Sequence, residues 1–121
     1  MRDNVRILIV EDDESIRDFI EMGLEDEGYQ SAVAADGAIA LALIPTYRPN
    51  IILLDLHMPN MDGRTFVDLY RQTPAPHARI IMLTASRNPT TAAAEIGADG
   101  LLAKPFDLDD LYATIKAFLP A

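Results

Sequence analysis

The 121-residue chain has no cysteine and only two histidines, and both shortages limit the kinds of metal site and cross-link that it can form. Without cysteine, the chain has no disulfide framework and no thiolate metal site. The two histidines, His57 and His77, are too few and too far apart in the sequence to indicate a zinc site.

Long apolar runs and positive charge are also scarce. No apolar stretch approaches the ~20 residues that a membrane-spanning helix needs. The charged start, residues 1–4, precedes too short an apolar run for a signal peptide. We therefore expect a soluble cytoplasmic protein without a membrane partner. Ten Lys and Arg against 19 Asp and Glu give a net charge of −9, which argues against direct nucleic-acid binding and is compatible with a bound divalent metal.

Half of the residues are hydrophobic, and their pattern indicates a single α/β domain over residues 1–121. Short apolar, β-branched runs alternate with segments in which apolar residues recur every three or four positions. Such alternation favours a doubly wound sheet of five parallel strands with five helical crossovers. The expected strands are residues 5–10, 29–34, 51–55, 79–84 and 100–104.

Local signals set the expected helix ends. Asp13 is an N-cap for the first helix, and Asp107 begins a capping box with Asp110 for the last. The second helix is expected to stop before Pro45, because proline lacks the backbone N–H that a helix interior requires. The fourth helix, residues 90–96, is short and rich in alanine, so we expect it to be the most weakly held element.

Polar residues occur where four of the expected strands end. Glu11 and Asp12 follow the first strand, Asp55 ends the third, Thr84 ends the fourth and Lys104 ends the fifth. Parallel strands place these ends on one edge, where ligands of open α/β sheets bind. Clustered carboxylates repel unless they are compensated, and they are the ligands that Mg²⁺ prefers. With a lysine and a hydroxyl beside them, the expected site suits a phosphoryl group on or near a carboxylate.

The chain resembles the receiver domain of two-component response regulators from about Arg6 to Phe118. Each short motif alone is weak, but together they occur in the family's order and at the expected strand ends. The motifs are Glu11-Asp12, Asp55 with Met58-Pro59 and Asp62-Gly63, Thr84-Ala85, and Lys104-Pro105-Phe106.

The resemblance implies a flavodoxin-like strand order of 2-1-3-4-5 and a signalling domain that catalyses only its own phosphotransfer and autodephosphorylation. Asp55 would accept a phosphoryl group from a sensor histidine kinase or a histidine phosphotransfer protein. The implied Mg²⁺ ligands are Glu11 (directly or through water), Asp12, Asp55 and the backbone carbonyl of His57. The implied phosphoryl contacts are Thr84, the Ala85 amide and Lys104, with Lys104 also beside Asp55 and Asp12 and a cis Lys104–Pro105 bond.

Three positions bear on how the implied switch works. Leu101 stands where the family commonly has an aromatic residue that turns inward on activation. His57 and Ser86 occupy positions that in the family border the path of the hydrolytic water and tune the phosphoryl lifetime. Kinase recognition in the family uses the first helix, which here is expected to involve Ile16, Arg17 and Ile20.

Two other functions compete with the phosphorylated switch. A pseudo-receiver would act only by docking, although such domains usually lose at least one of the acids, the threonine or the lysine. A haloacid-dehalogenase-like phosphatase needs a second acid two residues after its nucleophile, where this chain has His57. No output domain is expected within this chain, and its downstream target and kinase stay open.

Overall fold

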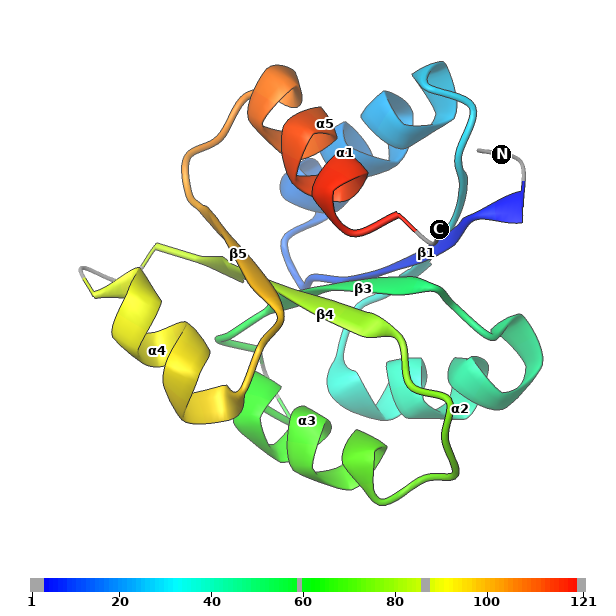
Figure 1. Cartoon of the computed structure of the whole chain (residues 1–121), viewed down its shortest axis with the longest axis vertical. Helices are drawn as coiled ribbons and strands as arrows, with labels where there is room; N and C mark the ends of the chain where they lie inside the picture. The colour runs from blue at the N-terminus through cyan, green and yellow to red at the C-terminus, as the bar shows by residue number, and fades with distance from the viewer. Residues whose placement is uncertain (1–3, 59, 86–87, 120–121) are drawn as a thin grey trace.

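The computed structural model describes residues 4–58, 60–85 and 88–119, which form a parallel sheet between two layers of helices (Figure 1). The five strands lie in the order β2-β1-β3-β4-β5, which confirms the expected fold class. The strands are β1 (Arg6–Val10), β2 (Gln30–Ala34), β3 (Ile51–Asp55), β4 (Arg79–Thr84) and β5 (Gly100–Ala103). The helices are α1 (Glu14–Asp26), α2 (Gly37–Tyr47), α3 (Gly63–Arg71), α4 (Pro89–Ile96) and α5 (Leu108–Ala117).

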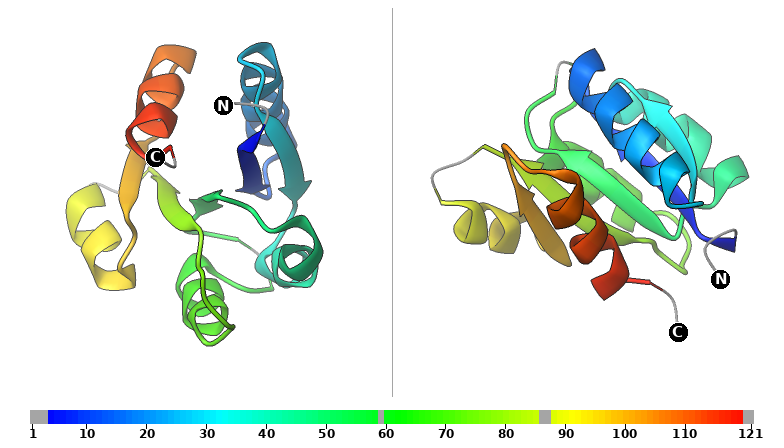
Figure 2. Two further views of the ribbon diagram at one scale, coloured as in Figure 1. Left: turned by 45° about the vertical axis from the view of Figure 1, so that its right-hand side comes forward. Right: turned by 90° about the horizontal axis from the view of Figure 1, so that it is seen from above.

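The helices cover opposite faces of the sheet: α1 and α5 one face, and α2, α3 and α4 the other (Figures 1 and 2). Alternate residues of the strands belong to two separate hydrophobic cores, because successive side chains of a strand point to opposite faces. Ile7, Ile9 and Leu53 pack with α1 and α5, whereas Leu8 and Leu54 pack with α2 and α3. All five residues of β3 are buried, as the apolar run predicts for a central parallel strand.

The helix caps follow the sequence closely. The Asp13 side chain accepts a hydrogen bond from the Ile16 amide, and Asp107 and Asp110 form the complete capping box. Gly97 ends α4 in the left-handed conformation, with φ of 69°. None of the described helices is long and apolar enough to cross a membrane.

The expected end of the second helix is wrong, because α2 continues through Pro45 to Tyr47. Pro45 lies in the last turn, so the helix loses only the one hydrogen bond that its missing N–H would have donated. Arg48 then ends the helix in the left-handed conformation, and its backbone N–H donates to the Ile44 carbonyl over 2.8 Å.

Candidate functional site

The polar residues predicted from the strand ends do meet at one edge of the sheet. In the β1–β3 register Val10 lies opposite Leu54, so the residues that follow, Glu11 and Asp55, are brought side by side. Carboxylate oxygens of Glu11, Asp12 and Asp55 lie within 4.8 Å of one another. Glu11 and Asp55 are buried, with 0% and 6% of their surface exposed, whereas Asp12 is exposed.

Lys104 joins the two buried carboxylates. Its Nζ donates to Glu11 Oε1 over 2.7 Å and to Asp55 Oδ1 over 3.3 Å. Its backbone N–H donates to the Thr84 carbonyl over 2.7 Å, which fixes the end of β5 against the end of β4. The expected contact with Asp55 is therefore confirmed. The ammonium also pairs with the buried Glu11, and Asp12 is not among its ion-pair partners in the described residues.

The pKa values of the two inner carboxyl groups are raised mainly because burial disfavours their charged forms. Burial raises the pKa of Glu11 from 4.5 to about 7, although the hydrogen bond from Lys104 opposes the shift. Burial likewise raises the pKa of Asp55, against the effects of Glu11 and Lys104. For Lys104, burial opposes the charged form, but the Glu11 hydrogen bond and the Asp55 charge prevail and raise the pKa of the ammonium.

The donor set fits a hard divalent cation. Three carboxylates converge and one ammonium pairs with two of them, so the fully ionised cluster carries two uncompensated negative charges. Mg²⁺ prefers carboxylate oxygens and keeps several waters, which suits a group whose outer member, Asp12, is exposed. Glu11, Asp12 and Asp55 are thus the residues that can hold such an ion.

The other predicted site residues follow or end the strands at the same edge of the sheet. Thr84 is buried at the end of β4, and Ala85 follows it in an exposed position. The Lys104–Pro105 bond is cis, as the resemblance implied. The exposed His57 follows β3, and its backbone N–H lies 3.4 Å from Asp55 Oδ1. Ser86 lies outside the described residues.

Leu101 is placed in β5 opposite Met82 of β4, and it packs against the core beneath α3 and α4. Its side chain is half-buried. Thr84 lies opposite Ala103, two residues farther along the same strand pair. Leu101 and Thr84 are therefore near neighbours in the sheet, although the structure brings only Thr84 to the end where the carboxylates lie.

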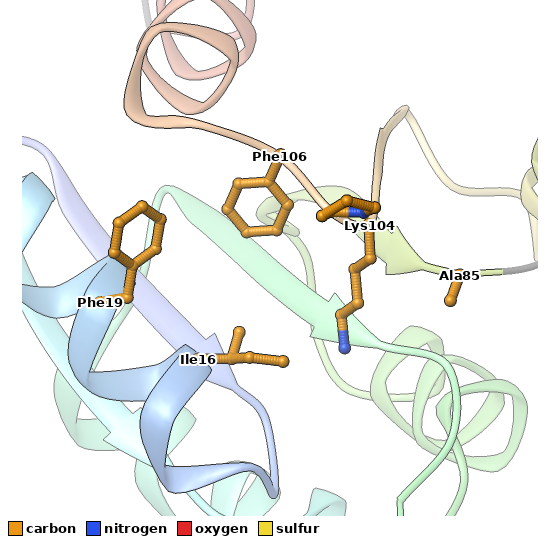
Figure 3. Close-up of a pocket in the computed structure, with 6 residues that line it drawn as sticks. Ile16, Phe19, Ala85, Lys104 and Phe106 are labelled. Atoms are coloured by element: carbon orange, nitrogen blue, oxygen red, sulfur yellow. The ribbon is translucent and has the colours of Figure 1, made fainter.

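A cavity of about 300 Å³ opens beside Lys104, between α1 and the loop after β5 (Figure 3). Ile16 and Phe19 line it from α1, and Phe106 lines it from the loop, with the two phenyl centroids 6.3 Å apart. Sequence reasoning missed Phe19, which is 36% exposed, and gave Phe106 no separate role. The spacing could have predicted this role, because Phe19 is three residues after Ile16 and therefore lies on the same side of the helix.

The expectation that Ile20 contacts a partner is wrong. Ile20 has 0% of its surface exposed and packs in the core beneath α1 and α5. Ile20 lies on the side of α1 that faces the sheet, whereas Phe19, one residue earlier, lies at the surface. Arg17 Nη1 donates to the Glu11 carbonyl over 3.1 Å, so its side chain supports the loop that carries the acidic cluster.

Comparison with known proteins gives a consistent result. The family model described as the response regulator receiver domain matches residues 7–116. The chain is 39% identical to response regulator MprA of Mycobacterium sp. (strain KMS) over 95% of its own length, and 38% identical to response regulator MprA of Mycobacterium tuberculosis (strain ATCC 25177 / H37Ra) over 96%. The matches cover 50% and 51% of those proteins, so the chain spans about half the length of these curated relatives.

Solved structures agree with the sequence relatives. The chemotaxis response regulator CheY4 of Vibrio cholerae superposes with a TM-score of 0.87 at 36% identity, covering 95% of this chain and 98% of that one. The receiver domain of a signal transduction histidine kinase from Syntrophus aciditrophicus superposes with a TM-score of 0.86 at 30% identity, covering 95% and 89%.

Proposed function

This chain belongs to the response regulator receiver domain family, and on that premise we propose that Asp55 accepts a phosphoryl group from a phosphohistidine. The observation that carries the proposal is the buried Asp55 carboxylate, with two other carboxylates within 4.8 Å and the Lys104 ammonium at 3.3 Å. Members of this family are signalling domains rather than enzymes that turn over an external substrate. Phosphorylation of Asp55 would be the event that changes the signalling state of this chain.

In the proposed step, an Asp55 carboxylate oxygen attacks the phosphorus atom of the phosphohistidine. A P–O bond forms and the P–N bond breaks, and the bonding electrons leave with the imidazole nitrogen. Lys104 contacts Asp55 Oδ1, which supports the proposal that its ammonium binds a phosphoryl oxygen once the acyl phosphate forms. The Thr84 hydroxyl and the Ala85 amide, at the end of the neighbouring strand, are the proposed donors to the other oxygens.

The acidic cluster would hold Mg²⁺ through Glu11, Asp12 and Asp55, with the His57 backbone carbonyl as a further ligand. When bound, the ion supplies positive charge that offsets both the carboxylates and the transferring phosphoryl group. The chain's own contribution is to keep Glu11 and Asp55 buried and close together, which makes the site unfavourable without a cation.

The phosphodonor is proposed to be a sensor histidine kinase or a histidine phosphotransfer protein that contacts the cavity beside Lys104. Exposed Phe19 and its neighbour Phe106 provide an apolar surface next to the acceptor carboxylate. Such a surface favours docking of an apolar helix face that presents its histidine to Asp55.

The test is incubation with Mg²⁺ and acetyl phosphate, followed by intact-mass measurement. We expect the mass of one phosphoryl group to be added in the wild-type chain, to be absent in Asp55→Asn, and to be prevented by EDTA. The Asp68→Asn variant, which changes an exposed carboxyl on α3, is the matched control and should be phosphorylated normally. A wild-type chain that stays unmodified would instead support the pseudo-receiver that acts by docking.

A further inference from the structure

A second cavity, of about 620 Å³, lies at the opposite edge of the sheet from Asp55. Its lining residues come mainly from α2, α3 and the segments that lead into β3 and β4. Figure 1 shows these elements, with α2 and α3 on the same face of the sheet. Asn50 lines the cavity and directly precedes β3, whereas Asp55 ends that strand. Five residues at ~3.3 Å each place the cavity roughly 16 Å from the acidic cluster.

The walls of this cavity are apolar and stiff. Leu41, Ile44 and Tyr70 contribute side chains from the two helices. Four of the chain's eight prolines also line it, namely Pro45, Pro49, Pro74 and Pro76. Because proline fixes its own φ, such walls change little when a ligand enters. The volume lies within the ~300–1,000 Å³ that small-molecule sites typically have.

The charge of the cavity is opposite to that of the protein as a whole. Two arginines, Arg6 and Arg48, line it, and none of the described lining residues is acidic, although the chain carries a net charge of −9. Arg6 is held by its Nε, which donates to the backbone carbonyls of Tyr47 and Arg48 over 2.9 Å each. Neither guanidinium forms an ion pair with a carboxylate of the described residues.

These contacts leave two cations beside the apolar cavity, of which Arg6 is held in place by the backbone. Arg6 uses Nε for the backbone, so its terminal nitrogens are the groups that remain for a ligand, and a guanidinium binds carboxylates with paired hydrogen bonds. Arg48 is exposed and follows the last turn of α2. A neutral ligand would leave both cations without a partner, and an inorganic anion would not contact the apolar walls.

We propose that this cavity binds a small amphipathic anion, a carboxylate carried on an apolar body. Arg6 and Arg48 bind the carboxylate, and the prolines, Ile44 and Tyr70 contact the apolar part. The site is separate from Asp55, so ligand binding there does not depend on phosphorylation chemistry.

The test is a titration of the isotope-labelled chain with hexanoate, followed by two-dimensional ¹H–¹⁵N NMR, with hexanol as the neutral ligand of equal chain length. We expect saturable hexanoate shifts at the amides of Ile44, Arg48, Asn50 and Thr73. Hexanol should bind roughly tenfold more weakly, because it lacks the charge that pairs with the arginines.

Two variants separate a built site from general apolar adsorption. Arg48→Gln should weaken hexanoate roughly tenfold and leave hexanol unchanged, whereas Arg64→Gln, an exposed arginine on α3 outside the cavity, should change neither. Asp55→Asn should bind hexanoate normally, whatever the outcome of the phosphorylation test. Equal binding of both ligands, shifts confined to the cavity of Phe19 and Phe106, or no saturable shift up to about 10 mM would overturn the proposal.

Discussion

Without Mg²⁺, the stability of this protein should fall as the pH rises from 5 to 8, because of Glu11. The pKa of Glu11 is about 7 in the folded protein, against 4.5 for an unperturbed side chain. Between these values the folded state keeps a proton that the unfolded chain has lost, so the free energy of unfolding decreases with pH. At ~1.36 kcal/mol per pKa unit, the loss reaches about 3 kcal/mol above pH 7.

Two other groups in the cluster affect this loss differently. The raised pKa of Asp55 acts in the same direction as that of Glu11. The pKa of Lys104 is raised from an ordinary value of 10.5, so this group stays protonated throughout the range from pH 5 to 8 and does not contribute to the loss. Mg²⁺ should restore stability more at pH 8 than at pH 5.5, because the ion binds the ionised carboxylates and proton release accompanies its binding.

The assay is urea unfolding in EDTA at pH 5.5 and pH 8, followed by far-ultraviolet circular dichroism. About 2 kcal/mol of this loss falls between pH 5.5 and pH 8, because the unfolded chain has already begun to ionise below pH 5.5. With a slope of ~1–3 kcal/mol per molar urea, the unfolding midpoint should shift by roughly 0.7–2 M between the two conditions. Glu11→Gln keeps the shape of the side chain and cannot ionise, so it should lose most of this shift. Equal midpoints in the wild-type protein, or an unchanged shift in Glu11→Gln, would refute the reasoning.

Four further substitutions test separate parts of the protein. Lys104→Met leaves two buried carboxylates without their cation, so in EDTA at pH 8 the free energy of unfolding should fall by about 3–5 kcal/mol; a urea midpoint equal to that of the wild type would contradict this. Phe19→Ala should slow phosphotransfer from the cognate kinase with little loss of stability, whereas Ile20→Ala should cost about 2–5 kcal/mol of stability, because only Ile20 is fully buried. Equal stabilities of these two variants would show that the division between surface and core on α1 is incorrect. His57→Ala should change the rate at which phosphorylated protein loses its phosphoryl group without abolishing phosphorylation, and identical decay times by intact mass would argue against a role for this side chain.

The fold and the carboxylate edge could be predicted because their signals are local. The apolar run of β3 ends in Asp55, and parallel strands bring such ends together whatever the details of packing. The helix N-caps at Asp13 and Asp107 could equally be predicted from the sequence, since each depends on a side chain and an amide three residues apart.

Features that depend on tertiary packing could not be read in the same way. Glu11 and Asp12 are adjacent in sequence, but only the fold decides that Glu11 is buried and pairs with Lys104 while Asp12 stays exposed. The exposure of Phe19 beside the buried Ile20 depends on how α1 rotates against the sheet. The cavity near Arg48 is formed by segments that are distant in sequence and carry no recognisable motif.

The most direct test of the central claim is phosphotransfer from purified, autophosphorylated histidine kinases of the same genome. We expect at least one kinase to transfer its phosphoryl group rapidly to the wild-type chain in the presence of Mg²⁺, and the same kinase to transfer none to Asp55→Asn. Equal transfer to both chains would place the acceptor elsewhere. Transfer from no kinase, together with no modification by acetyl phosphate, would contradict the assignment of Asp55 as a phosphorylation site.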